Sequence, residues 1–263
     1  MKRSNAISSL LFVLVITAGI FADIPKERKM SFSLSGGITA KHLDYYEDWE
    51  CPPEEPYPEN VYLSEYGWLY GLRLDGKLRY GKYSIGFVPE FFLSENLYHY
   101  KYTSLDIPLS YSDQHQLFAG LTGYLGYDFN LGRFGFAPSL YFGFRVWIND
   151  KNESHVDGMV YSREEKYTWG YFGPGLSSQY SITERFTLKA NMAYFYPFTG
   201  KVEYFFRNDL LVSVTLDFDV SDKLALFVGG EYERFETQKD YDGTIHDGTL
   251  QFNGLTAGIR YNP

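Results

Sequence analysis

Hydrophobic and polar residues alternate with a period of two along most of the chain. Between Gly67 and Tyr80, the large apolar side chains occupy one parity, and charged or small residues occupy the other. Successive side chains of a β-strand point to opposite faces, so this pattern predicts a strand with one apolar and one polar face. The same alternation returns at 115–129, 133–148 and 207–220.

The alternation predicts ten strands, most of them longer than the roughly 5–6 residues of a globular strand and long enough to cross a bilayer at a tilt. In chain order they cover about 31–43, 62–80, 83–93, 115–129, 133–148, 166–181, 186–197, 207–220, 224–237 and 249–262.

The predicted connections alternate between short and long. The short ones are 81–82, 130–132, 183–185 and 221–223, and the long polar ones are 44–61, 94–114, 149–165, 198–206 and 238–248. All tight turns therefore lie at one end, like the periplasmic turns of a transmembrane barrel. An even strand count places both termini at that end.

The alternative to a membrane barrel is a soluble β-sandwich or lipocalin-like barrel, which would fit the same parity with its charges outward; the export signal, the strand length and the aromatic positions favour the membrane. The polar parity carries glycines and charges of both signs along whole strands, as expected for a narrow lumen filled with ion pairs. The apolar parity carries Tyr, Trp and Phe toward the strand ends, as in the aromatic girdles of lipid-facing barrels. We therefore predict an all-β fold, a ten-stranded antiparallel transmembrane up-and-down barrel. In this barrel, lipid contacts Trp68, Leu72, Phe142 and Val214, while Arg73 and Asp217 face the lumen.

The first 22 residues have the features of a secretory signal peptide. Lys2 and Arg3 precede the apolar stretch 10–21, and Ala22 follows it as a small residue at a cleavage site. An N-terminal membrane anchor is the alternative, but the apolar run is short for one. We expect a signal peptide at 1–22, the barrel at 23–263 and localisation in the outer membrane of a Gram-negative-type bacterium.

Composition excludes several other classes of protein. Aromatic residues make up 19% of the chain, too many for a disordered protein. The net charge of −9 disfavours binding to nucleic acid. Cys51 is the single cysteine, so it has no disulfide partner in the chain. After residue 22, no apolar run approaches the roughly 20 residues of a membrane-spanning helix.

The layout of ten strands and five long loops resembles that of the omptins, a family of outer-membrane endopeptidases. Leu211–Glu236 and Gln251–Tyr261 are similar in spacing to the end of an omptin. The resemblance implies a rim site in which an Asp-Asp pair and an Asp-x-His pair activate water. Loop 198–206, where Asp-x-His would lie, has neither Asp nor His, and Asp106 and Asp113 are not a closely spaced pair. We therefore predict no catalytic residue and no cofactor.

The last long loop contains the most distinctive polar motif. Asp240 and Asp242 form an Asp-x-Asp-Gly sequence, and Asp247 follows, so the loop supplies oxygen ligands and a turn that a hard cation needs. These three residues are the candidate metal ligands. The alternative is an ordinary polar hairpin loop that uses Asp and Gly as turn residues.

Three functions are compatible with the sequence. The first is a non-enzymatic surface protein with a charge-filled lumen, acting in envelope structure, adhesion or recognition. The alternatives are an omptin-like endopeptidase or other rim hydrolase, and a narrow channel. The expected partners are outer-membrane lipid and lipopolysaccharide, periplasmic chaperones, the barrel-assembly machinery and divalent cations at the acidic loops. The first loop is the most acidic, with Asp44, Glu47, Asp48, Glu50, Glu54, Glu55 and Glu59.

Overall fold

The structure is a computed structural model that describes residues 30–50, 60–95, 98–99, 110–111, 115–156, 159–198, 204–241 and 244–263. The expected signal peptide at 1–22 and Cys51 lie outside the described residues. Residues 31–263 form one compact unit, the barrel. Within the described residues, no helix is long and apolar enough to cross a membrane.

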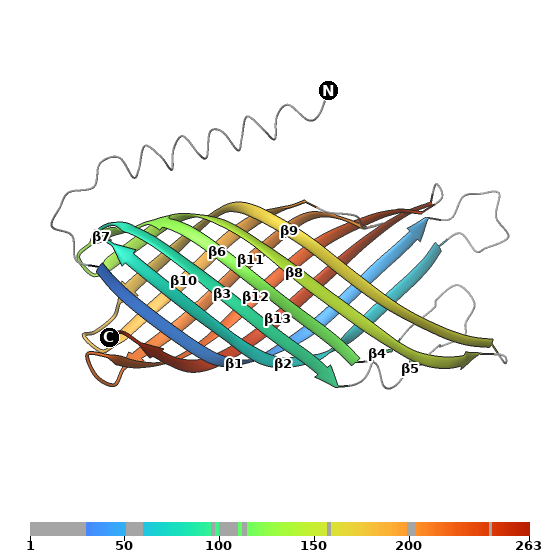
Figure 1. Cartoon of the computed structure of the whole chain (residues 1–263), viewed down its shortest axis with the longest axis horizontal. Helices are drawn as coiled ribbons and strands as arrows, with labels where there is room; N and C mark the ends of the chain where they lie inside the picture. The colour runs from blue at the N-terminus through green and yellow to red at the C-terminus, as the bar shows by residue number, and fades with distance from the viewer. Residues whose placement is uncertain are drawn as a thin grey trace, which may run out of the picture. The chain divides into compact units, whose positions relative to one another are not determined.

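Ten long strands close into an antiparallel barrel (Figure 1). They are β1 (Met30–Glu50), β2 (Asn60–Tyr80), β3 (Tyr83–Glu95), β6 (His115–Tyr127), β8 (Phe134–Val156), β9 (Met159–Ser181), β10 (Phe186–Phe198), β11 (Tyr204–Asp219), β12 (Leu224–Tyr241) and β13 (Thr244–Tyr261). Neighbours along the chain are hydrogen-bonded, β6 pairs with β8, and β1 closes the barrel on β13. Closure gives each of the ten long strands, where it is described, a hydrogen-bonded neighbour on both sides, which is what a strand needs in lipid.

Three short strands complete the fold. β7 (Phe129–Leu131) follows β6 after a break at Asp128 and pairs with the same strand, β8. β4 (Tyr98–His99) and β5 (Ser110–Tyr111) form a separate small pair. The number of barrel strands is therefore ten, as predicted.

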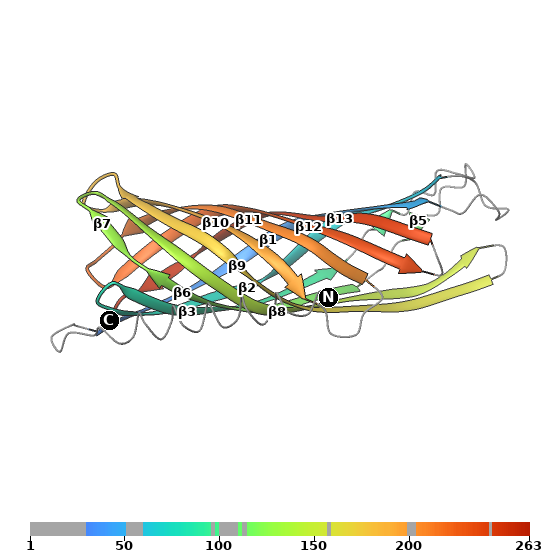
Figure 2. The same cartoon turned by 90° about the horizontal axis from the view of Figure 1, so that it is seen from above.

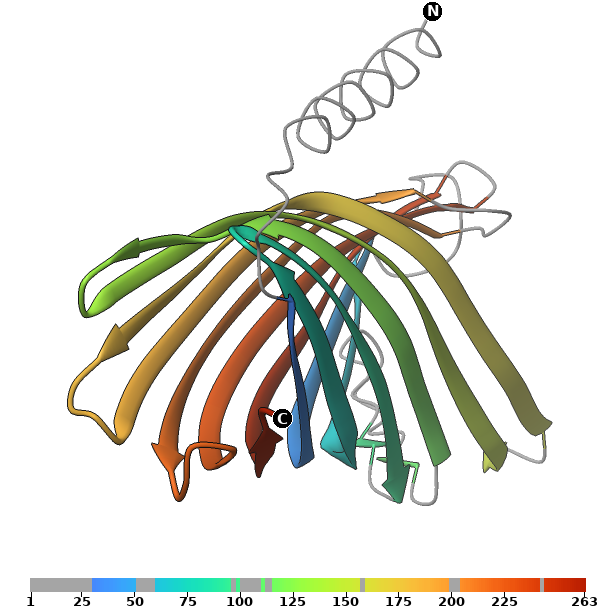
Figure 3. The same ribbon diagram turned by 60° about the vertical axis from the view of Figure 1, so that its left-hand side comes forward.

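The tight turns gather at one end of the barrel, which comes forward in Figure 3. Gly81 and Gly132 have φ angles of 61° and 67°, a conformation that glycine adopts without the steric cost of a side chain. In another turn, the hydroxyl oxygen of Thr183 accepts a hydrogen bond from the Phe186 amide at 3.0 Å. The amide of Asn262 donates to the carbonyl of Lys223 at 2.8 Å, so the C-terminus lies at this end, where β1 also begins. The predicted placement of the tight turns is confirmed.

The outer wall of the barrel is apolar. Side chains such as Ile38 and Leu72 are 70% and 60% exposed, although they are among the most hydrophobic in the chain. Trp68, Phe142 and Val214 are exposed in the same way. Asp217 is 3% exposed and Arg73 points into the lumen, where it reaches Glu231. The predicted direction of both faces is therefore confirmed.

Many aromatic side chains on the outer wall lie in two groups near the strand ends, whereas Phe87 and Phe142 lie between the groups. The group toward the long connections contains Tyr66, Trp68, Tyr70, Tyr196 and Phe198, and the group toward the tight turns contains Phe129, Phe134, Tyr180, Phe186 and Tyr261. Beside the first group the wall becomes polar, because the His42 ring packs on Trp68 and its Nδ1 lies 3.2 Å from a carboxylate oxygen of Asp44. These groups match the girdles expected at the two membrane surfaces.

The strands extend further into the long connections than predicted. β8 continues to Val156, and β9 already begins at Met159. The hairpin that they form projects beyond its neighbours in Figure 2. Likewise, β12 continues to Tyr241, and β13 already begins at Thr244. The apolar alternation stops before these strands end, because the backbone hydrogen-bond ladder does not depend on apolar side chains. The predicted loops 149–165 and 238–248 are therefore mostly paired strand.

Candidate functional site in the barrel lumen

Seven charged side chains meet across the middle of the lumen and form what we call the ion layer. Its members are Lys41, Arg73, Glu90, Arg145, Asp209, Glu231 and Glu233. They come from β1, β2, β3, β8, β11 and β12, so the layer bridges strands around the barrel. Three cations face four carboxylates.

Lys41 and Arg145 are the two centres of the ion layer. The Lys41 ammonium lies 2.6 Å from Glu231 and 3.6 Å from Glu90. The Arg145 guanidinium lies 2.8 Å from Asp209 and 2.5 Å from Glu233. Burying an unpaired charge costs several kcal/mol, roughly, so these groups depend on one another for their place in the fold.

An aromatic layer adjoins the ion layer, mostly toward the long connections, although two of its members lie beside Arg145, where the Tyr171 hydroxyl reaches Thr122 and the Phe195 ring contacts Tyr141. Its members are Phe92, Phe118, Trp147, Trp169, Tyr171, Phe195, Phe235 and Phe252, with Leu43, Leu69 and Leu250 packed among them. Each of these side chains is buried, and several are fully inaccessible to water. Rings from opposite parts of the chain meet edge to face, as Phe118 and Phe252 do at 5.4 Å between centroids.

Rings of the aromatic layer pack against the two central cations. The Lys41 ammonium is 4.4 Å from the centroid of the Phe92 ring. The Arg145 guanidinium is 4.6 Å from the Tyr171 ring and 5.0 Å from the Phe235 ring. Aromatic faces attract cations electrostatically, and the attraction is larger where water is excluded. The two layers together fill the cross-section of the lumen.

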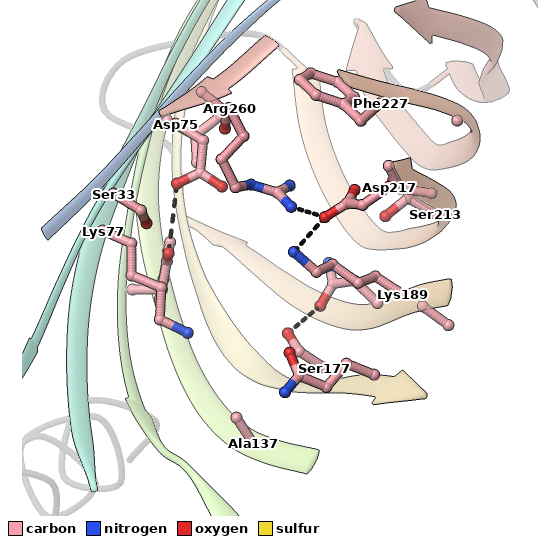
Figure 4. Close-up of a pocket in the computed structure, with 18 of the residues that line it drawn as sticks. Ser33, Asp75, Lys77, Ala137, Ser177, Lys189, Ser213, Asp217, Phe227 and Arg260 are labelled. Atoms are coloured by element: carbon pink, nitrogen blue, oxygen red, sulfur yellow. Dashed lines mark hydrogen bonds and ion pairs between the residues drawn. The ribbon is translucent and has the colours of Figure 1, made fainter. Parts of the chain in front are cut away.

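Below the ion layer, the lumen contains a polar cavity of about 630 Å³, which we call the turn-end cavity. It ends at Lys41, Arg145 and Glu233 on one side, and Asn262 and Pro263 line it toward the tight turns. Hydroxyl and amide side chains line much of the wall, and Tyr141 donates to Asn191 at 2.9 Å. Figure 4 shows Lys77 and Lys189 directed into this space from different strands.

The candidate metal ligands are not brought together by a described loop. Asp240 lies in β12 opposite Ile245, and Asp247 lies in β13 opposite Asp48 and Gln238. Asp242 lies outside the described residues. Among the described side chains, no group of three His, Cys, Asp or Glu residues is arranged to hold a metal ion. The cation site at these three aspartates stays a prediction.

The aromatic layer is the main feature that the alternation did not predict. Its residues occupy the lumen-facing parity, where only polar or small residues were expected. The signal was a local loss of alternation: in Phe91-Phe92-Leu93 and Leu117-Phe118-Ala119, both parities are apolar. Such runs mark strand segments that are apolar on the lumen side as well as the lipid side.

Comparison with known proteins identifies the fold. No family model and no curated protein sequence matches this chain. The outer-membrane protease OmpT of Escherichia coli has a similar structure, with 14% identity over 90% of this chain and 99% of that protein and a TM-score of 0.60. The translocator domain of the autotransporter NalP of Neisseria meningitidis has 10% identity over 98% of this chain and 96% of that domain, with a TM-score of 0.48.

The likeness to OmpT concerns the fold, because identity is too low to carry activity. The chain has the fold of bacterial outer-membrane β-barrels, as the alternation predicted. Its apolar wall corresponds to the surface that such barrels turn toward lipid.

Proposed function

We propose that this outer-membrane β-barrel is a non-conducting surface protein. Its barrel anchors the polar connections at the membrane surface and does not pass solutes. The observation that supports this role most directly is the stacking of the aromatic layer on the ion layer. Lys41, Arg145 and Phe118 are each at most 2% exposed, so these side chains leave little room for water at the middle of the lumen.

The closed lumen disfavours the narrow-channel alternative. A solute that crossed the barrel would have to displace paired charges and close-packed rings at the same level. Separating a buried ion pair costs about 3–5 kcal/mol, and the ion layer contains several such pairs. The barrel is better suited to hold its surface segments in place than to open.

The sequence of the long connections supports recognition rather than proteolysis. Segment 198–206 lacks the Asp-x-His pair that the omptin resemblance implies. Segment 44–59 is rich in carboxylates, which favours contacts with divalent cations or a basic partner, and cations would bridge it to the phosphates of lipopolysaccharide.

A liposome-swelling assay tests the proposed function. Vesicles containing the folded protein should swell in iso-osmotic arabinose no faster than protein-free vesicles. A general porin in matched vesicles provides the positive control. Swelling that depends on the folded protein would contradict the proposal, as would cleavage of peptides by the folded protein in lipopolysaccharide-containing membranes.

A further inference from the structure

In the turn-end cavity, two cationic side chains pair with each of two buried carboxylates. Lys189 lies 2.6 Å from Asp217, and Arg260 pairs with the same carboxylate oxygen. Lys77 lies 3.5 Å and Arg79 lies 2.8 Å from Asp128. Each carboxylate therefore serves two cations, so each of these groups has a formal surplus of one positive charge.

The surplus positive charge faces the cavity. The side chains of Lys77, Lys189 and Arg79 are 27%, 32% and 40% exposed. Their partners Asp128 and Asp217 are only 10% and 4% exposed. The carboxylates are thus buried behind the cations, and the accessible part of each pair is its positive end. A lysine ammonium has three N–H donors, so Lys189 retains donors after it binds Asp217.

Two further carboxylates line the same cavity, so its four cations near the tight turns face four aspartates and their formal charges sum to zero. Asp75 is half-buried, accepts a hydrogen bond from the Tyr124 hydroxyl at 3.4 Å and lies near Arg260 in Figure 4. Asp219 ends β11 and lines the cavity as well. Asp75 is therefore the group whose charge most directly opposes an anion between Lys77 and Lys189.

We propose that the turn-end cavity binds a small phosphate-bearing solute between Lys77 and Lys189. Lysine binds phosphate through charge-assisted hydrogen bonds, and the hydroxyl of Ser213 lines the same wall and supplies a further donor. The volume of about 630 Å³ is in the range of small-molecule sites. The ion layer closes one end of the cavity. The other end opens toward the tight turns, which are periplasmic in such barrels. Binding is independent of the proposed surface function.

Calorimetric titration of the folded protein with inorganic phosphate, in an uncharged phosphate-free detergent at low ionic strength, tests the proposal. The wild type should bind phosphate saturably. The double variant Lys77→Gln and Lys189→Gln should bind at least about tenfold more weakly, because it loses two charge-assisted hydrogen bonds to the phosphate. Asp75→Asn should bind more tightly than the wild type. Lys223→Gln, in the exposed turn after β11, removes a charge outside the cavity and should leave the affinity unchanged.

Heat-modifiable gel mobility verifies that each variant is folded. If the double variant does not fold, the single variants Lys77→Gln and Lys189→Gln decide the question, since a site between the lysines predicts weaker binding by each, and unchanged affinity in both would overturn the proposal. Absence of saturable binding by the wild type, or equal affinity in wild type and a folded double variant, would overturn the proposal. A parallel titration with dihexanoyl phosphatidylglycerol distinguishes the source of the phosphate. If only this lipid showed the lysine dependence, the ligand would be a headgroup and not a free solute.

Discussion

Lys41 on β1 and Glu231 on β12 meet at 2.6 Å in the middle of the lumen, and both side chains are almost fully buried. At this position, the charges of both residues are balanced only by other members of the ion layer among the described side chains. The pair therefore couples the first strand of the barrel to its penultimate long strand through side chains, in addition to the backbone closure on β13.

Replacing Lys41 should destabilise the barrel strongly. Lys41→Met leaves Glu231 and its neighbouring carboxylates with less cationic charge, and we predict a loss of about 3 kcal/mol or more in the free energy of unfolding. Urea unfolding in lipid vesicles, followed by tryptophan fluorescence, measures it. The double variant Lys41→Met and Glu231→Gln should recover part of the loss. Lys223→Met, in an exposed turn, is the control and should change stability by less than about 0.5 kcal/mol. Equal stability of Lys41→Met and this control would contradict the role of the ion layer.

Truncating a ring of the aromatic layer should also destabilise the fold. Phe118 is 1% exposed and contacts Phe92, Trp169 and Phe252. Phe118→Ala should cost about 3–5 kcal/mol in the same unfolding assay, because the neighbouring rings sit on rigid strands and fill the cavity only partly. Phe129→Ala removes a ring from the outer wall near the tight turns and should cost clearly less. A reversed order would show that the interior rings are not packed as described.

A charge on the outer wall tests which solvent that wall faces. Val214 is 47% exposed on β11 and lies in the apolar belt. Val214→Arg should destabilise the barrel by about 2–4 kcal/mol in a bilayer if the residue lies near its midplane. Asp222→Arg, in the exposed turn between β11 and β12, should have little effect. Equal tolerance of both variants in lipid would contradict a lipid-facing wall.

Substitution by alanine should lower the stability of the barrel at one strand glycine and leave it nearly unchanged at another. A Cβ at Gly173 would collide with the backbone carbonyl oxygen of Tyr194, whereas a Cβ at Gly230 would meet its nearest neighbour at 3.7 Å. Gly173→Ala should therefore cost about 1–3 kcal/mol through overpacking, and Gly230→Ala should be nearly neutral. Thermal unfolding of the two variants side by side measures the contrast. A neutral Gly173→Ala variant would be the contrary result.

The predicted cation site at Asp240, Asp242 and Asp247 is tested by calcium. Ca²⁺ should raise the unfolding free energy of the wild type, by about 2.7 kcal/mol at a hundredfold excess over its dissociation constant. The variant Asp240→Asn, Asp242→Asn and Asp247→Asn should lose this dependence. If the variant were stabilised by Ca²⁺ as much as the wild type, the site would lie elsewhere.

The sequence was sufficient to predict which side chains of the barrel wall face lipid and which face the lumen. The opposite parities of Leu72 and Arg73 alone indicate which residue faces lipid once the strand is known to cross a membrane. Turn positions were also readable, because Gly81 and Gly132 mark sites with positive φ. The hairpin ends at Val156 and Tyr241 were not readable, because paired strands in water need no apolar face.

The contents of the lumen were only partly predictable. Alternation placed Arg145 and Glu233 inside, but their pairing depends on the stagger of strands around the barrel, which hydrophobic patterning does not encode. The same holds for Lys189 and Arg260, which share Asp217 from three different strands. The aromatic layer had a visible signal in runs such as 91–93, where lipid-facing and lumen-facing residues are both apolar.

Single-channel recording in planar bilayers tests the closed lumen most directly. After insertion of the folded wild-type protein, verified by its heat-modifiable mobility, we predict a baseline without discrete conductance steps. Reproducible steps from the folded wild type, absent after the same sample is heat-denatured, would show that ions pass Lys41, Arg145 and Phe118, and would contradict a sealed barrel.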